Sequence, residues 1–187
     1  MGRGGHCARH GAGLSILDGS RRHPAGRGLA AQGQAEEGIL QIRQGLAAFR
    51  ATGGEISETY HLALLAEAYG HGGQVEAGLR ALADALAAAH HTGERFWEAE
   101  LHRLQGDLLL QQASSPAQTT EAEVCLQRAI EVARRQQAKA LELRAAVSLG
   151  RLWQRQGKRV EARQMLAEIY GWFTEGFDTA DVIEAKA

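Results

Sequence analysis

Three residues near the start of the chain, His6, Cys7 and His10, have the imidazole and thiol groups that bind zinc. A zinc site also needs an ordered frame and usually a fourth ligand. Residues 1–26 contain seven Gly and three His, a composition that disfavours helix and packed structure. We therefore expect residues 1–26 to be a disordered or altered leader, and we expect no metal or other cofactor.

The other histidines and the second cysteine have simpler interpretations. His90 and His91 come at the end of an expected helix, where partial positive charge interacts favourably with the helix dipole. His102 lies inside an expected helix and is expected to pack rather than titrate. Cys125 lies among apolar residues, so we expect a half-buried, inert thiol and no disulfide with Cys7.

Two pairs of acids, Glu98 with Glu100 and Glu121 with Glu123, have the residue type of a general acid–base dyad. Residues two apart point to different faces of a helix, so we expect these carboxylates to solvate the surface. The sequence contains no G-x-x-x-x-G-K-[ST] phosphate loop. The chain is therefore not expected to be an enzyme by itself.

The amino-acid composition indicates that the residues discussed above lie on helices. Apolar residues make up 44% of the chain and aromatic residues only 5%, so Leu and Ala must fill the core, which favours helices. The net charge of -1 argues against binding to nucleic acid or to an anionic membrane. With no long apolar run and no secretory signal, a cytoplasmic protein is expected.

A repeated pattern organises these helices. A small residue is followed four positions later by a large apolar residue and then, after three more, by another small one. The pattern recurs after 40, 44 and 40 residues, and its fourth copy departs only at Ile169. The copies are Gly38, Ile42, Gly45; Gly78, Leu82, Ala85; Ala122, Leu126, Ala129; and Ala162, Leu166, Ile169.

A second kind of helix precedes three of these copies, and it carries a small residue three positions before a large apolar one. The small residues are Ala66, Gly106 and Gly150. From each of these residues to the first small residue of the next helix is 12 positions, except from Gly106 to Ala122, which is 16, and the four extra residues are expected in a loop at Ser114-Ser115-Pro116. Small residues at these positions predict close crossing of antiparallel helices.

The resulting map has about 3.5 repeats of 40–44 residues and a short terminal helix. Thr120 and Glu123 form a predicted capping box, and Gly93 and Gly157 are expected at helix ends. The expected helices are 33–52, 56–71, 74–92, 95–112, 119–136, 139–156, 158–173 and 179–187.

The two ends of this map differ. The helix at 33–52 lacks a preceding partner, so we expect its apolar stripe to be partly uncovered and the chain to be part of a longer protein. Self-association through this helix is one expectation that follows. At the other end, Trp172, Phe173 and Phe177 are expected to seal the last pair next to a capping helix. The stripe comprises Ile39, Ile42, Leu46 and Phe49.

The motifs Leu65-Ala66-x-x-Tyr69 and Leu149-Gly150-x-x-Trp153 resemble the tetratricopeptide repeat family. The resemblance implies an all-α, right-handed solenoid of antiparallel helix pairs over residues 27–187. More narrowly, residues 62–69, 92–101 and 170–181 look like the C-terminal helical region of bacterial signalling ATPases linked to an adenylate/guanylate cyclase or to a transcription regulator. That resemblance implies a sensor or coupling arm whose catalytic half lies elsewhere.

In proteins of this family the first helix of each pair lines a groove that binds a partner. Applied to this chain, the resemblance implies a groove that passes from acidic to basic residues and takes a protein or peptide segment of mixed charge; a small effector stays open as an alternative. Tyr60, Arg144 and Arg151 are the leading expected contacts. The groove positions are Tyr60, Ala63, Glu67, Gly70, Glu100, Arg103, Asp107, Leu110, Arg144, Val147, Arg151 and Gln154.

The sequence thus predicts an interaction scaffold. Two alternatives remain at this point: a structural homo-oligomer formed through the first helix, and a component of a cyclase or ATPase whose activity a separate chain supplies.

Overall fold

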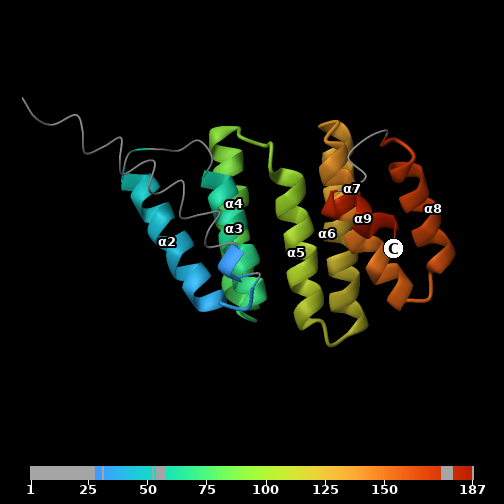
Figure 1. Cartoon of the computed structure of the whole chain (residues 1–187), viewed down its shortest axis with the longest axis horizontal. Helices are drawn as coiled ribbons and strands as arrows, with labels where there is room; N and C mark the ends of the chain where they lie inside the picture. Colours follow the sequence, from blue (N-terminus) through green and yellow to red (C-terminus); the bar gives the residue numbers. More distant parts are fainter. Residues whose placement is uncertain (1–27, 31, 52, 54–57, 174–178, 187) are drawn as a thin grey trace, which may run out of the picture. The chain divides into compact units, whose positions relative to one another are not determined.

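The computed structural model describes residues 28–30, 32–51, 53, 58–173 and 179–186, and Figure 1 shows that these residues form helices joined by short links. The expected leader at 1–26 and Phe177 lie outside them. No described helix is long and apolar enough to cross a membrane. The helices are α2 (Ala35–Ala51), α3 (Glu58–His71), α4 (Val75–Thr92), α5 (Glu98–Gln112), α6 (Pro116–Arg135), α7 (Lys139–Arg155), α8 (Arg159–Tyr170) and α9 (Ala180–Lys186).

The chain divides into two compact units, Met1–Thr92 and Gly93–Ala187. In the first unit, α3 packs against both α2 and α4. The apolar stripe of α2, expected to be partly uncovered, is covered: Ile39, Ile42 and Leu46 are 7%, 0% and 5% exposed. Phe49 makes an edge contact with the His61 ring at 4.9 Å. The expectation of an open first helix is therefore wrong, because α3 buries that face.

In the second unit, α6 packs against α5 and α7, and α8 packs against α7. The first helices of the two pairs, α5 and α7, also contact each other. The short helix α9 packs on α7 and α8 and buries Val182 in the same cluster as Leu149 and Ile169. Of the expected aromatic cap, Phe173 packs on this cluster, whereas Trp172 is 62% exposed.

Three-residue links join α3 to α4, α5 to α6, α6 to α7 and α7 to α8, and all but the α5–α6 link close with the same turn. At Gly157 (φ 82°) the amide donates to Gln154, and the next amide, of Lys158, donates to the Trp153 carbonyl at 2.8 Å. This is a Schellman motif, whose left-handed residue is usually Gly. Gly33 and Gly73 have the same conformation and the same bonds.

The link between α6 and α7 makes this turn without a glycine. Gln137 has φ 55°. As in the other turns, its own amide donates to the Arg134 carbonyl, and the next amide, of Ala138, donates to the Ala133 carbonyl. A side chain in the left-handed region costs roughly 1–2 kcal/mol. The chain thus makes the same turn at this link even though Gln, unlike Gly, disfavours a positive φ.

The four extra residues between Gly106 and Ala122 do not lengthen a loop. The link between α5 and α6 has three residues, like the links α3–α4 and α7–α8, and Pro116 begins α6. Ser115 is the N-cap, since its side chain accepts a hydrogen bond from the Gln118 amide at 3.3 Å. Thr120 lies inside the helix and donates to the Pro116 carbonyl, so the capping box predicted there is wrong. The insertion mainly adds a turn to the start of α6.

Close helix crossing at the small residues agrees with the prediction. A Cβ placed on Gly106 would lie 2.7 Å from Leu126 Cγ and 3.1 Å from the Ala122 carbonyl oxygen. A Cβ on Gly150 would meet only the Leu166 side chain, 3.1 Å from its Cδ1. The pair α5–α6 therefore leaves no room for a methyl group at its crossing, whereas α7–α8 has a flexible neighbour.

Glu142 ties α7 to α6 where these two helices meet at their link. Its side chain is 3% exposed and accepts hydrogen bonds from Arg134 Nε at 2.7 Å and Lys139 Nζ at 2.8 Å. Burial by itself raises the pKa of the Glu142 carboxyl, but the hydrogen bonds and charges of the two cations outweigh burial and lower the pKa below its ordinary value.

We predict opposite effects of the same substitution at the two crossings. Gly106→Ala should destabilise the second unit by about 1–3 kcal/mol, because the new methyl group meets backbone on α6. Gly150→Ala is the matched control and should be neutral or stabilising by up to about 1 kcal/mol, since Ala favours helix and Leu166 can move. Urea unfolding of both variants measures the difference; equal effects would contradict the close crossing.

We also predict a pH-dependent contribution from Glu142. Because its folded-state pKa lies below the unfolded value, its stabilisation is present above the unfolded pKa and is lost as pH falls through the folded one. Glu142→Gln should cost about 1–2 kcal/mol at pH 7, and the deficit should shrink in acid. Urea unfolding at pH 7 and in acid measures this, with the exposed Glu131→Gln as control. A deficit that is the same at every pH would contradict the assignment.

Candidate functional site

Four of the twelve predicted groove positions, Tyr60, Ala63, Glu67 and Gly70, lie on α3 in the first unit. Tyr60 and Glu67 are half-buried on α3, seven residues and about two turns apart on one face of the helix. The ring of Tyr60 lies 5.7 Å from that of His61. Burial lowers the pKa of His61, and the nearby charge of Glu58 opposes this shift. The other eight predicted positions lie in the second unit.

In the second unit, α5 holds a compact group of charges around Arg103. The guanidinium binds both carboxylate oxygens of Glu100, at 2.8 and 2.9 Å, and Asp107 at 2.5 Å. The spacing of three and four residues places all three side chains on one face of the helix. Arg103 is only 14% exposed, and Glu100 and Asp107 neutralise its charge. This predicted partner contact is therefore already paired within α5.

The two arginines of α7 connect this group to α9. Arg144 Nη1 lies 3.8 Å from Glu100, and its Nε donates to Asp181 at 2.7 Å. Arg151 forms an ion pair with Glu184. The face shared by α5, α7 and α9, called the first-helix face below, therefore runs acidic, basic and acidic again. The predicted passage from acidic to basic omits the acids of α9.

Asp107 on this face has a raised pKa. Burial raises its pKa, and the Glu100 charge adds to the rise. The charges of Arg103 and Arg151 and a hydrogen bond from Ser148 Oγ at 3.2 Å oppose the rise without cancelling it. Asp107 thus lies within a network of ion pairs. In the described part of the chain, no three His, Cys, Asp or Glu side chains gather as a metal site would require.

Of the four acids that the sequence predicted to be solvated, Glu121 is exposed and the others are not. Glu98 and Glu100 are each 7% exposed, so that expectation is wrong for both. Glu123 accepts hydrogen bonds from Trp153 Nε1 at 2.7 Å and from the Gln156 amide at 3.2 Å. Burial tends to raise the pKa of Glu123, but these bonds and Lys158 lower it overall. The repeat pattern could have indicated that Glu123 faces the next helix, because Glu123 directly follows Ala122, a small residue at the crossing.

The remaining reactive side chains are placed as expected where the structure describes them. Cys125 is half-buried, and burial with the charge of Glu121 raises the pKa of its thiol, which disfavours the reactive thiolate. His90 and His91 lie exposed in the last turn of α4, and His102 is half-buried. The group His6, Cys7 and His10 lies outside the described residues.

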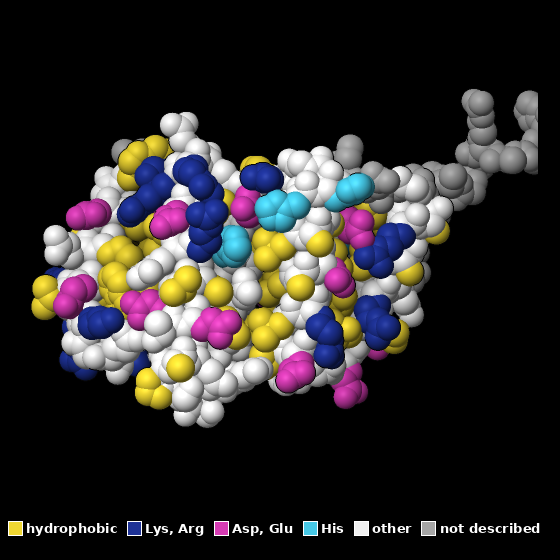
Figure 2. Space-filling model, turned by 180° about the vertical axis from the view of Figure 1, so that it is seen from behind, with side chains coloured by type: hydrophobic (Ala, Val, Ile, Leu, Met, Phe, Trp, Pro, Cys, Tyr) yellow, Lys and Arg dark blue, Asp and Glu magenta, His cyan; other side chains and the backbone are white. Residues whose placement is uncertain are grey.

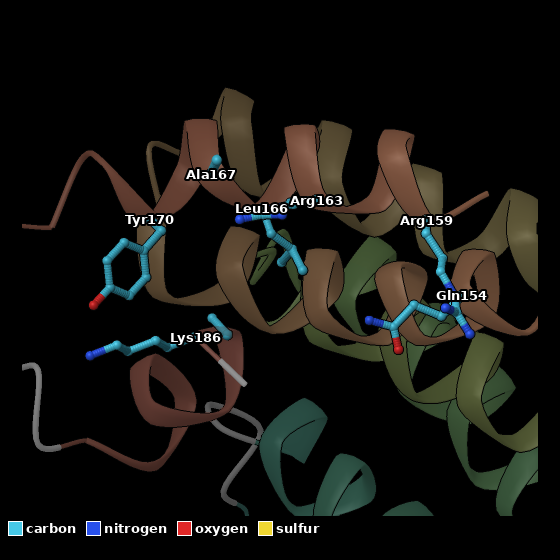
Figure 3. A pocket seen from close by; sticks show the side chains of 8 residues that line it. Gln154, Arg159, Arg163, Leu166, Ala167, Tyr170 and Lys186 are labelled. Atoms are coloured by element: carbon cyan, nitrogen blue, oxygen red, sulfur yellow. The ribbon is translucent and has the colours of Figure 1, made fainter. Parts of the chain in front are cut away.

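The last predicted contact, Gln154, lines a groove of about 530 Å³ between α7, α8 and α9. Figure 3 shows Gln154 and Arg159 at one end, Tyr170 and Lys186 at the other, and Leu166 between them. The groove is elongated along α8. Its lining comprises Gln154, Arg159, Arg163, Leu166, Ala167, Tyr170, Ala185 and Lys186.

The wider surface shows no separation of charge on the face drawn in Figure 2. Lys and Arg side chains are interspersed there with acidic and hydrophobic ones. This mixture suits contacts with protein better than with a uniformly charged polymer.

No protein-family model matches this chain, and no curated protein matches its sequence. Two solved structures of a putative kinesin light chain from Podosopora anserina, described as having nearly identical TPR-like repeats, do have a similar fold. One, with 19% identity, aligns over 96% of this chain and 84% of its own with a TM-score of 0.65. The other, a point variant with 21% identity, covers 82% and 73% with a TM-score of 0.58. The chain has an all-α, TPR-like repeat fold, as predicted.

We predict that the ion pairs of the first-helix face hold α9 in place. Arg144→Glu should increase amide hydrogen exchange around Val182 by several fold, because it repels both Asp181 and Glu100; the cost is about 1 kcal/mol for a partly exposed pair. Adding Asp181→Arg should restore protection in part. Unchanged exchange in the single variant would show that apolar packing alone holds α9.

Proposed function

We propose that this protein is a binding scaffold: a stack of TPR-like helix pairs that holds a partner protein and couples it to a larger signalling assembly. The TPR-like fold carries this proposal, since solenoids of this type present side chains from successive helices on one extended surface. The resemblance of residues 62–69, 92–101 and 170–181 to bacterial signalling ATPases suggests an arm linked to a nucleotide cyclase or transcription regulator.

The distribution of charge refines where a partner can bind. Arg103, Arg144 and Arg151 already have acidic neighbours, so a partner would have to compete with existing ion pairs on the first-helix face of the second unit. Gln154 is exposed at the edge of the groove and is the predicted contact best placed to meet a partner, and Tyr60 and Glu67, half-buried on α3, stay predicted contacts. Protein or peptide is the ligand class that the proposal names.

The two alternatives have less support. Self-association was expected from a partly uncovered apolar stripe on α2, but Ile39, Ile42 and Leu46 of that stripe are buried and Phe49 is half-buried. A catalytic role by means of a separate chain fits the proposed coupling arm, in which the ATPase or cyclase activity belongs to the partner. The residues named above supply binding surface and no reaction step.

The proposal is tested by photo-cross-linking in the cells that produce the protein. A cross-linking amino acid at Tyr60 or Gln154 should capture a partner that mass spectrometry identifies as, or links to, an ATPase, cyclase or regulator. Ala87 on α4 and Gln127 on α6, both exposed, are matched control positions. Equal capture at all four positions, or ATP hydrolysis or cyclase turnover by the purified chain alone, would contradict the proposal.

A further inference from the structure

A groove of about 510 Å³ lies on the first unit between α2 and α4, with α3 as its floor. Helix α3 packs against both neighbours, whereas α2 and α4, each described in full, make no contact with each other. The residues that line the groove fall within 43–50 of α2, 62–69 of α3 and 77–84 of α4, which is about two turns or 10 Å on each helix. The groove is therefore short and has a helix on each side.

Three alanines on the walls leave space in this groove. By the repeat pattern, α2, α3 and α4 correspond to α6, α7 and α8 in the second unit. At the same positions those helices have longer side chains, which would occupy such a space. The pairs are Ala47 with Glu131, Ala77 with Glu161, and Ala81 with Met165. The groove thus results from residues inside two long helices, of 17 and 18 residues, and not from the end of one.

Each wall has one arginine without a strong acidic partner. Arg43 of α2 forms no ion pair with any residue that the structure describes, and no acid lies three or four positions from it on its helix. On α4, Arg80 Nη1 lies 3.9 Å from Glu76, but the two side chains are 75% and 78% exposed, so this ion pair contributes little. The counterparts of the two arginines in the second unit are Gln127 and Gln164, which carry no charge.

The third arginine that lines the groove, Arg50, has a structural role. Its Nε donates to Glu58 of α3 at 2.8 Å. The same ion pair recurs in the second unit, where Arg134 pairs with Glu142 over the same interval of eight residues. Arg50 therefore helps to join α2 to α3, and the other two arginines have no such task.

Those two arginines lie beside the same turn of α3. Arg43 comes seven residues before Arg50. In antiparallel helices this places Arg43 level with Leu65, which comes seven residues after the α3 partner of Arg50. Arg80 comes seven residues after the middle of the link between α3 and α4, so it is level with the residue that follows Leu65. One turn further along α3, the hydroxyl of Tyr69 has no hydrogen bond to any residue in the described part of the chain.

The far end of the groove carries an acid. Asp84 lies one turn after Arg80 on α4 and is the one acid among the residues that line this groove. The floor there is formed by Leu62 and Leu65, which are buried. A ligand that lies along this floor can place one anionic group beside the arginines, but Asp84 would repel a second anionic group.

We infer that this groove binds a small organic anion, with one carboxylate or phosphate group between Arg43 and Arg80 and a short apolar chain along the leucines. Guanidinium groups bind both kinds of oxyanion, and Tyr69 can donate a hydrogen bond from its hydroxyl. The volume of the groove lies in the range of about 300–1,000 Å³ that is usual for ligand pockets. A protein partner would need a contact of about 800 Å² on each side, far more than this groove offers. The inference goes beyond the scaffold proposal, because it adds a small ligand.

The test is an NMR titration of the purified, ¹⁵N-labelled full chain with hexanoate, hexyl phosphate and hexylamine, which share one apolar chain and differ in the charged group. At least one of the anions should bind with a Kd on the order of 1 mM and about tenfold more tightly than the amine. The amide shifts that it causes should centre on Arg43, Tyr69 and Arg80. The anion that binds more tightly identifies the charged group.

Two variants separate this site from general surface charge. Arg43→Gln with Arg80→Gln copies the neutral residues of the second unit and should weaken anion binding about tenfold. Ala47→Glu keeps both arginines but adds a carboxylate four residues after Arg43, and it should weaken binding to a similar extent. All three residues are exposed, so both variants should keep the fold, which circular dichroism checks.

Arg135→Gln, at an exposed cation of α6 outside the groove, is the matched control and should leave the affinity unchanged. Equal binding of anion and amine, full affinity in the double variant, or equally tight binding of acetate and inorganic phosphate would overturn the inference. So would binding of a Glu-rich peptide without binding of either six-carbon anion. Capture of a partner at Tyr60 or Gln154 tests the scaffold proposal separately and does not depend on these results.

Discussion

Helices α5 and α6 approach so closely that Gly106 has no space for even one methyl group, with Leu126 and the Ala122 carbonyl directly against it. This contact fixes how the two helices are rotated and how far each extends past the crossing. The rotation of α5 then determines where its remaining side chains point. Leu104 and Leu108 are buried, and Glu100 and Asp107 lie on the first-helix face.

The same crossing in the next pair aligns α7 with α5, and the charges follow from that alignment. Glu100 and Arg144 occupy equivalent positions six residues before their crossing residues, so they face each other across neighbouring first helices. Asp181 and Glu184 then satisfy the arginines on the other side. Since Arg144 and Arg151 are satisfied in this way, the first-helix face differs from the groove on α8, where no acid lines the wall.

Much of this architecture could be predicted from the sequence because its causes are local. Small residues at fixed spacing located the crossings, and Gly157 marked a turn whose positive φ favours glycine. The helix bounds agree within about three residues. The resemblance also identified α5 and α7 as the helices that carry the charged face, which the ion pairs between them support.

The failures have nonlocal causes. Arg144 finds its partner Asp181 37 positions along the chain, on a helix whose docking no periodicity indicated. Glu100 is of a residue type usually found at the surface, and its burial is explained by its pairing with Arg103 and, across to α7, with Arg144. On α2, Ile39 was expected to be open, yet it lies against the end of α3, where a Cβ on Gly72 would be 3.6 Å from Ile39 Cδ1. Whether Tyr60 and Glu67 bind a partner remains a prediction.

The extra turn at the start of α6 has a consequence for how the chain reaches its native pairing. Chains of similar repeats are prone to misassembly, because a helix can pack in the place of its counterpart from another repeat. Since α6 begins about one turn earlier than its counterparts, a swap with α4 or α8 would leave Pro116 and the turn after it without the partner that α5 provides. Unequal length thus distinguishes otherwise similar pairs and disfavours domain-swapped and register-shifted forms.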